Sequence, residues 1–176
     1  MAEAFLRRRL DDLAIQGRVH SAGLIRGDEP ASAPGVEVLA GRGLDISSHR
    51  SRVMNRQLLA GADLLVGMAR EHVREAVLAA PEVWPRAFTL KELVRRGEEA
   101  GHRGPGESLE SWLARAHGDR ANADLLGQSD DDDIYDPLGE SKDTYARTAE
   151  EISGLVDRLV DLAWPAAARE SAGVRL

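Results

Sequence analysis

Apolar residues recur at helical spacing at both ends of the chain. Within residues 1–16 they lie three and four positions apart, with arginines and aspartates between them, which is typical of a half-buried helix. This pattern is already running at Met1, so no capping residue precedes it. The clearest period extends from Tyr145 to Ala163, where apolar positions follow one another in steps of four and three residues. Pro165 predicts that this last helix ends there.

The middle of the chain alternates between strand and helix patterns. The apolar run Leu64–Met68, bounded by polar residues, predicts a strand buried on both faces. A helix over Arg70–Ala79 and a strand over Arg86–Phe88 follow. Thr89 and Glu92 then form a capping box at the start of another helix. Strands and helices that alternate with short connections predict an α/β fold, with a parallel sheet covered on both sides.

Shorter elements surround this alternation. Residues 18–22 predict a further strand, and small helices are expected near residues 36–40 and 55–60. Glycines and Pro105 loosen the chain over residues 97–133, but apolar residues at helical spacing between Leu109 and Ala116 predict one amphipathic helix there. We therefore expect residues 97–133 to be an ordered insertion.

Composition narrows the class of protein. A length of 176 residues suits one domain, which we place at residues 1–164 with a flexible tail over 165–176. The sequence contains no cysteine, which excludes disulfides, thiolate metal sites and a cysteine nucleophile within it. We see no secretory signal and no membrane-spanning run, and the net charge of −7 argues against nucleic acid as the main partner. We therefore predict a cytoplasmic protein that binds neither membrane nor nucleic acid.

Carboxylates gather shortly before the last helix. The run Asp130–Asp133 could bind a divalent cation, but it lacks the alternation, glycine and distal glutamate of a calcium loop, so a solvated acidic loop is favoured. Asp136 differs because Pro137 restricts the backbone beside it. A carboxyl group held rigidly on a loop suits a general acid, although Asp-Pro is also common in turns.

A basic segment, His49-Arg50-Ser51-Arg52, is the second candidate. Guanidinium groups match phosphate and could hold an anion, but a basic surface loop is favoured on composition alone. The other histidines show no metal-ligand spacing, and Ser21 lacks the glycine pattern of a serine nucleophile. These residues alone lead no further than an α/β domain.

The order of these segments resembles the low-molecular-weight protein-tyrosine phosphatase family. The matching stretches are Met1-Ala2-Glu3-Ala4 opening a helix, Ser21-Ala22-Gly23 after a strand, Leu44 to Arg52, Asp63 to Met68, and Asp136-Pro137 before the final helix. The resemblance covers most of residues 1–96 and 134–164. It implies a flavodoxin-like, three-layer fold and the hydrolysis of a phosphotyrosine protein or a small aryl phosphate through a cysteinyl-phosphate intermediate, with no metal or cofactor.

The resemblance also assigns roles to three residues. Asp136 matches the general acid, which protonates the leaving tyrosine oxygen and then acts as base toward water. His49 matches a histidine that supports the phosphate-binding loop from beneath. Leu138 stands where the family often has an aromatic residue that forms a wall for the substrate ring, so selectivity for aryl groups is in doubt.

In the family, Met-Ala-Glu-Ala directly follows a Cys-x-x-x-x-x-Arg-Ser/Thr-Pro loop that supplies the nucleophile and the phosphate cradle. Here this tetrapeptide begins at Met1. We therefore expect a chain without the first, central strand and without the loop. Each buried backbone group left unpaired costs about 1–3 kcal/mol, so these 176 residues should be unstable or rearranged, and inactive by themselves.

Two interpretations remain open. In the first, which is favoured, the start codon has been placed too late and the product is a phosphatase with an upstream strand and loop. In the second, the chain is a noncatalytic remnant that binds a partner. Arsenate reduction on the same fold is a third possibility, but it also needs cysteines.

Overall fold

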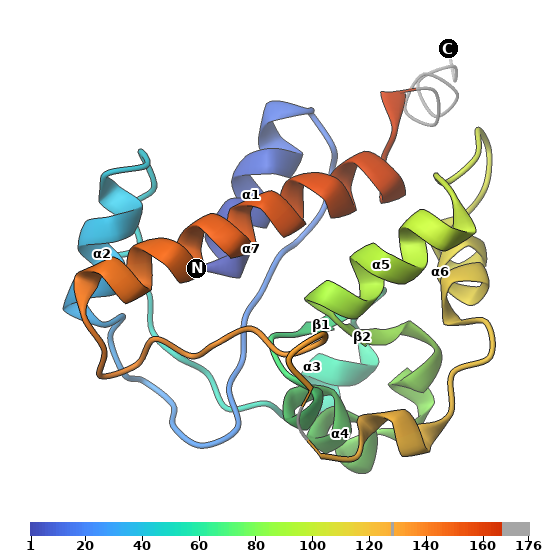
Figure 1. The fold of residues 1–176 in the computed structure, drawn as a ribbon, viewed down its shortest axis with the longest axis horizontal. Coiled ribbons are helices and arrows are strands. Elements are labelled where there is room, and N and C mark those ends of the chain that lie inside the picture. The colour runs from blue at the N-terminus through green and yellow to red at the C-terminus, as the bar shows by residue number, and fades with distance from the viewer. Residues whose placement is uncertain (128, 167–176) are drawn as a thin grey trace. The chain divides into compact units, whose positions relative to one another are not determined.

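The computed structural model describes residues 1–127 and 129–166, and Figure 1 shows the course of the chain. Its α-helices are α1 (Ala2–Asp12), α2 (Ala33–Ala40), α3 (Arg56–Ala60), α4 (Arg70–Ala79), α5 (Leu90–Ala100), α6 (Leu109–His117) and α7 (Lys142–Ala163). Its strands are β1 (Leu65–Gly67) and β2 (Ala87–Thr89), and its 3₁₀ helices are η1 (Pro81–Arg86) and η2 (Asn122–Leu125).

The chain divides into two compact units. Residues 1–54 and 134–157 form the first unit, and residues 55–133 with those from 158 onward form the second. The predicted single domain over residues 1–164 stays a prediction. The predicted flexible tail lies outside the described residues from position 167 onward.

The first unit is built from helices and extended loops. The predicted helices at the two ends of the chain are confirmed as α1 and α7, and α1 begins at Ala2, after Met1 as the N-cap residue and without a side-chain cap. Apolar side chains of α1, α2 and α7 form the core of this unit; the largest of them are Phe5, Leu10, Val38, Leu39, Tyr145, Ile152 and Val156.

The predicted strand over residues 18–22 is wrong, because these residues form no β-ladder. Instead, Gly23 makes an isolated parallel bridge with Val53, in which the Gly23 amide donates to the Arg52 carbonyl at 2.8 Å. A strand exists only where a neighbouring strand takes up its backbone hydrogen bonds, and none of the described residues supplies one beside 18–22. In place of the predicted strand, the chain forms one isolated bridge, at the following Gly23.

The second unit contains the parallel sheet. Strands β1 and β2 pair in parallel, with Val66 opposite Phe88, and α4 lies in the connection between them, as the strand–helix alternation predicts. All of β2 is buried, but Leu65 and Val66 of β1 are only half-buried. The prediction of a strand buried on both faces is therefore wrong for β1, which has β2 as its one paired neighbour among the described residues.

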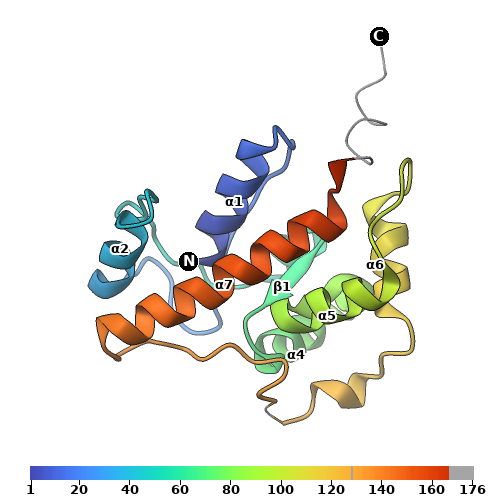
Figure 2. The ribbon, with the colours of Figure 1, turned by 45° about the horizontal axis from the view of Figure 1, so that its top comes forward.

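Helices α5 and α6 lie side by side in both ribbon views (Figures 1 and 2). The predicted capping box opens α5, since the Glu92 amide donates to Thr89 Oγ1 at 3.1 Å. The predicted amphipathic helix within residues 97–133 forms as α6. Its fully buried Trp112 packs close to Gly97 of α5 and donates from Nε1 to the Gly101 carbonyl at 2.8 Å. This segment is therefore packed against the rest of its unit.

An arginine, Arg120, anchors the chain just after α6. The guanidinium of Arg120 lies 4.0 Å from the ring centre of Trp84 and 4.1 Å from that of Phe88. Its Nε atom is 2.7 Å from a carboxylate oxygen of Glu92, and the Arg120 side chain is fully buried. A buried guanidinium requires such a carboxylate and aromatic faces to offset its desolvation.

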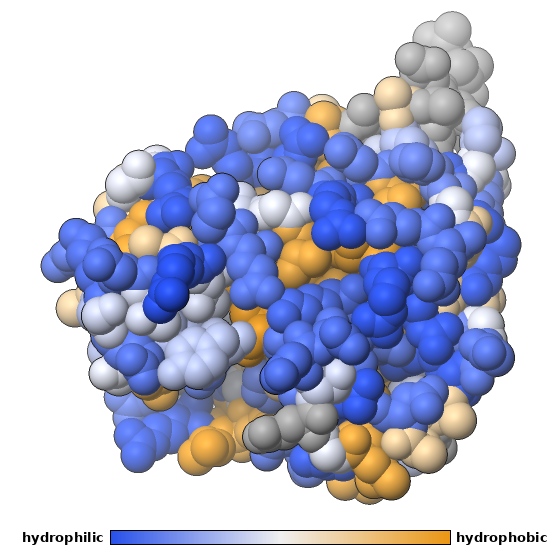
Figure 3. All heavy atoms as spheres, viewed as in Figure 1, coloured by the Kyte–Doolittle hydropathy of each residue, from blue (hydrophilic) through white to orange (hydrophobic). Residues whose placement is uncertain are grey.

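Among the described residues, no helix combines the length and the apolar character that crossing a membrane requires. Figure 3 shows hydrophilic side chains over most of the viewed face, with hydrophobic groups between them.

Candidate functional site

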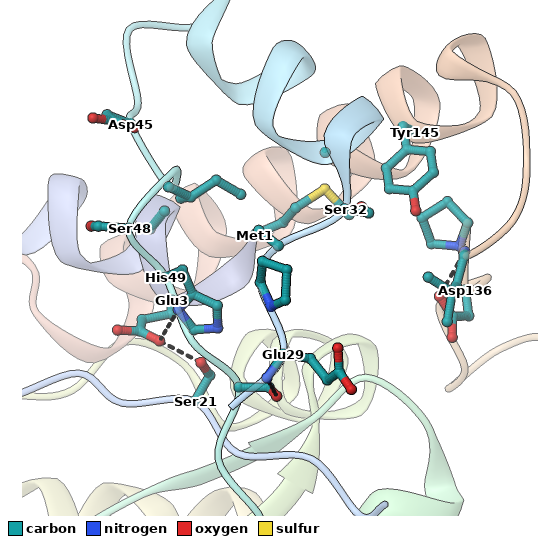
Figure 4. A pocket seen from close by; sticks show the side chains of 18 of the residues that line it. Met1, Glu3, Ser21, Glu29, Ser32, Asp45, Ser48, His49, Asp136 and Tyr145 are labelled. Carbon is teal, nitrogen blue, oxygen red and sulfur yellow. Dashed lines mark hydrogen bonds and ion pairs between the residues drawn. The ribbon is translucent and has the colours of Figure 1, made fainter. Parts of the chain in front are cut away.

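The first unit contains a cavity of about 420 Å³ (Figure 4). Its wall combines the start of α1, residues 29–35, residues 45–51, and the segment that leads into α7. The three residues to which the resemblance assigns a role, His49, Asp136 and Leu138, all line it. The fold thus brings together residues that are almost ninety positions apart, and their individual roles stay predictions.

One end of the pocket is organised around the carboxylate of Glu3. The hydroxyl of Ser21 and the guanidinium of Arg7 both donate to it, and His49 Nδ1 lies 4.0 Å from its Oε2 atom. Figure 4 shows Ser21 and His49 directed toward Glu3. Burial alone would raise the pKa of Glu3, but the hydrogen bond from Ser21 and the charge of Arg7 outweigh it and hold the pKa below its ordinary value of 4.5. Glu3 is therefore a compensated anion.

The opposite side of the pocket carries Asp136. Its Oδ1 atom accepts a hydrogen bond from the Leu138 amide at 3.0 Å, which closes a turn around Pro137. The turn holds the backbone of Asp136 in place. At the preceding residue, the Tyr135 carbonyl accepts a hydrogen bond from Thr148 Oγ1 of α7 at 3.4 Å. The side chain of Asp136 has no cationic partner in the described part of the chain.

Two side chains beside Asp136 have contrasting exposure. Leu138 is 73% exposed on the rim, so it offers an aliphatic contact but no aromatic face. Tyr145 of α7 also lines the pocket and is only 4% exposed. A Cβ atom on Gly35 would lie 3.5 Å from the Tyr145 ring, an ordinary contact distance, so α2 and Tyr145 pack closely at this position. The sequence predicts Tyr145 only as a core position of the last helix.

Glu3, Ser21, Glu29 and Tyr145 are pocket residues that the sequence does not single out as site residues. Glu3 and Ser21 do stand within two of the motifs that carry the family resemblance, and that placement is the signal that could have identified them. For Glu29 and Tyr145 there is no such signal, because only the fold shows that they share a pocket with Asp136.

The acidic run before Asp136 is only half the solvated loop that its composition favours, since Asp130 and Asp131 are exposed but Asp132 and Asp133 are not. Asp132 is buried, with oxygens 2.7 Å from Arg70 Nη2 and 2.8 Å from Arg95 Nη1. Asp133 accepts the first backbone amide of α4, that of Arg70, at 2.7 Å. A short-range pattern of charges does not reveal partners 37 and 62 residues away. No group of acidic or histidine side chains within the described ranges could hold a metal ion.

Only two residues of the basic segment, residues 49–52, contribute to the pocket wall. His49 and Ser51 line the pocket, whereas Arg50 and Arg52 are exposed and do not. Arg50 donates to the carbonyl of His49 at 2.9 Å. The arginines of this segment therefore form no anion site at the pocket.

The sequence profile of the family described as "Low molecular weight phosphotyrosine protein phosphatase" matches residues 1–105. The chain belongs to this family, as its motifs predict.

The probable low molecular weight protein-tyrosine-phosphatase EpsP of Ralstonia solanacearum is 35% identical over 93 residues, 53% of this chain and 62% of EpsP. A second EpsP, of Ralstonia nicotianae, is 34% identical over the same share of each chain. The chain thus spans about 62% of the length of the curated relatives that it matches.

The fold agrees with solved structures of the family. The low molecular weight protein tyrosine phosphatase of T. tengcongensis is 31% identical, with a TM-score of 0.67 over 91% of this chain and 87% of that one. YwlE arginine phosphatase from Geobacillus stearothermophilus, 24% identical, has a TM-score of 0.64 over 91% of this chain and 80% of that one, which shows likeness of fold alone. The predicted α/β, flavodoxin-like class is confirmed.

Proposed function

We propose that this protein takes part in the hydrolysis of phosphotyrosine or related aryl phosphates, and that Asp136 acts as the general acid and base. Family membership supports the reaction class. The observation that carries the role of Asp136 is its position on the pocket that also holds His49, on a turn that fixes its backbone. The substrate that we propose is a cytoplasmic phosphotyrosine protein.

The family reaction, as the resemblance implies it, has two steps. A thiolate forms a bond to phosphorus while the bond to the aryl oxygen breaks, and the electron pair left on that oxygen takes the proton of Asp136. Water then attacks phosphorus, Asp136 takes back a proton, and the sulfur–phosphorus bond breaks. The sequence has no cysteine, so these 176 residues supply the acid but not the nucleophile. We therefore propose that they do not turn over substrate by themselves.

His49 and Leu138 have supporting roles in this proposal. His49 lies beside the compensated Glu3 carboxylate, where it would brace a phosphate-binding loop. Leu138 would contact the substrate ring by its exposed side chain without stacking on it. An aliphatic rim contact gives less selectivity for aryl groups than an aromatic one.

The proposal is tested by supplying the missing chemistry. A strand followed by a Cys-x-x-x-x-x-Arg-Ser-Pro loop, joined directly ahead of Met1, should make the protein hydrolyse 4-nitrophenyl phosphate, whereas the 176-residue chain should not. In this fusion Asp136→Asn should lower kcat for phenyl phosphate by about 10²–10⁴-fold. The loss should be smaller for 4-nitrophenyl phosphate, whose leaving group needs no proton.

Asp143→Asn is the matched control, since Asp143 is exposed on α7 and does not line the pocket. It should leave both rates unchanged. A folded fusion that hydrolyses neither ester, or an Asp136→Asn variant equally impaired on both, would contradict the assignment. If the fusion does not fold, a synthetic strand-and-loop peptide added to the chain provides the same comparison.

The absence of cysteine favours a second candidate, a noncatalytic module that binds phosphotyrosine peptides. In that case the 176-residue chain should unfold cooperatively as a monomer and bind such peptides without cleaving them. Cleavage of these peptides, or failure of the folded chain to bind them, would count against this candidate and favour the first.

A further inference from the structure

Glu29 has a fixed backbone and an unpaired carboxylate on the pocket. Its amide donates to Ser51 Oγ at 3.0 Å, and its carbonyl accepts from the Ser51 amide at 2.9 Å. The adjacent Pro30 makes an antiparallel bridge with Arg50. These contacts position the residue, yet its carboxylate forms no ion pair with any described residue, although it lines the pocket.

Charge is distributed unevenly between the two ends of the pocket. At one end, the carboxylate of Glu3 is neutralised by Arg7 and has His49 beside it. Figure 4 shows the carboxyl group of Glu29 directed away from that end, toward the side of Asp136. Glu29 is exposed and has no cationic partner among the described residues, so its negative charge is available on this side of the pocket.

Tyr145 adds a hydrogen-bonding group and an aromatic ring to this side of the pocket. Its side chain is 4% exposed, lines the pocket, and makes no hydrogen bond through its hydroxyl within the described part of the chain. Figure 4 shows the hydroxyl directed toward the segment of Asp136. The hydroxyl is not among the buried polar atoms that lack a partner, so it is open to the pocket and offers a ligand a hydrogen bond, and the aromatic ring beside it attracts cations.

We propose that Glu29 is a specificity-determining residue, which selects phosphotyrosine peptides that carry lysine or arginine next to the tyrosine. This inference rests on the function proposed above and specifies its substrate class. A general acid carries its proton when the substrate enters, so Asp136 is then neutral and Glu29 is the charge that remains. A phosphate that enters beside this unpaired carboxylate is repelled, unless the substrate brings positive charge to that side. A basic flank would pair with Glu29, and an acidic flank would add to the repulsion.

The test uses the 176-residue chain and fluorescent peptides, with binding measured by anisotropy at low salt. The probes are a phosphotyrosine flanked by two arginines, the same peptide flanked by two glutamates, and the unphosphorylated arginine peptide. The arginine peptides should bind more tightly than the glutamate peptide. Glu29→Gln should reduce that preference by about two- to fivefold, as expected for one exposed charge pair. Salt at 0.5 M should weaken it further.

Asp28→Asn is the matched control, because it removes the same charge one residue away. Asp28 does not line the pocket, and its positive φ of 64° suits asparagine as well. It should leave the preference within experimental error of the parent chain. If both substitutions had the same effect, the preference would depend on the overall charge of the protein and not on Glu29, which would overturn the proposal. Equal binding of the basic and acidic peptides, or no binding at all, would overturn it as well.

The unphosphorylated peptide separates this inference from the proposed function. If Glu29→Gln weakens its binding while the fusion shows no phosphatase activity, charge selection stands and the catalytic assignment fails. If the fusion is active but hydrolyses peptides with basic and acidic flanks at equal kcat/KM, the catalytic assignment stands and the role of Glu29 fails.

Discussion

Gly67 closes strand β1 where the chain turns into α4, and it has no room for a side chain. A Cβ atom there would lie 2.9 Å from a methyl group of Val73 and 3.1 Å from the carbonyl oxygen of Ala69. Because a backbone carbonyl cannot rotate away, Gly67→Ala should destabilise the protein by about 1–3 kcal/mol. The free energy of unfolding, measured in urea, tests this.

Gly61 is the matched control for Gly67. A Cβ atom on Gly61 would meet only the Gln57 carbonyl, at an ordinary 3.6 Å, and its φ of −84° is accessible to alanine. Gly61→Ala should therefore be neutral or stabilise the protein by about 0.4–1 kcal/mol, through the unfolded chain. Equal effects of the two substitutions would show that the close approach at Gly67 carries no cost.

The sequence identifies some of the residues that line the pocket and not others. Asp136 and His49 stand within recognisable motifs, so the resemblance places both on the site, and the structure does bring both to one pocket. Glu29 is one of 30 acidic residues and has no distinguishing neighbour. Tyr145 has the same spacing as its apolar helix neighbours. Their proximity to Asp136 depends on long-range packing, which no local pattern contains.

Asp132 links two helices of the second unit, since it accepts from Arg70 at the start of α4 and from Arg95 within α5. Asp132→Asn keeps the size of the side chain but removes the charge from both contacts. We expect a loss of about 2–3 kcal/mol in the free energy of unfolding. Thermal or urea denaturation of the variant measures this.

Asp131→Asn makes the same chemical change one residue away. Asp131 is exposed, and its carboxylate has no partner among the described residues, so this variant should stay within about 0.5 kcal/mol of the parent chain. Should the two variants be equally stable, the buried contacts of Asp132 would be worth no more than a solvated surface charge.

The sequence predicts helices better than strands, because a helix makes its hydrogen bonds within its own segment and a strand makes them with another. Helices α4 and α6 form where periodicity places them, because a helix makes its hydrogen bonds within its own segment. The strand expected over residues 18–22 depends on a neighbouring strand, and the described chain offers Gly23 a single bridge instead. Strand β1 appears as expected, but its burial depends on what covers it and is lower than its apolar run suggests.

Carboxyl groups whose pKa is lowered by their partners occur in both units, so they affect how the stability of the whole molecule depends on pH. In the first unit, a hydrogen bond from Lys142 lowers the pKa of Glu37 below its ordinary 4.5. In the second, a hydrogen bond from Arg115 does the same to the pKa of Glu107. Burial opposes the shift at Asp132, but hydrogen bonds from its arginine partners still hold the pKa below 3.8. Each of these groups binds its proton less readily in the folded than in the unfolded state.

The folded state should therefore lose stability in acid. A carboxyl group with a depressed folded pKa contributes its full stabilisation above the unfolded pKa, here 3.8–4.5, and loses it as the pH falls through the lower folded value. His117 acts in the same direction from a higher pH, since burial, and then the charge of Arg120, lowers its pKa below 6.5. Burial also lowers the pKa of the Met1 amino group below 8.0. We expect the Tm to decline slightly as the pH falls from 8 to 4.5, where the Met1 amino group and His117 titrate, and to fall steeply below 4.5.

Calorimetric melts between pH 8 and pH 3 test this profile, and Asp132→Asn provides the comparison that assigns it. An amide does not titrate, so below pH 4.5 the Tm of this variant should fall less steeply than that of the parent chain, and the two curves should converge in acid. A parent Tm that rises as the pH drops from 5 to 3 would mean that relief of the net charge of −7 outweighs the loss of these paired carboxylates. The contacts of Glu37, Glu107 and Asp132 would then contribute little to the stability of the folded chain.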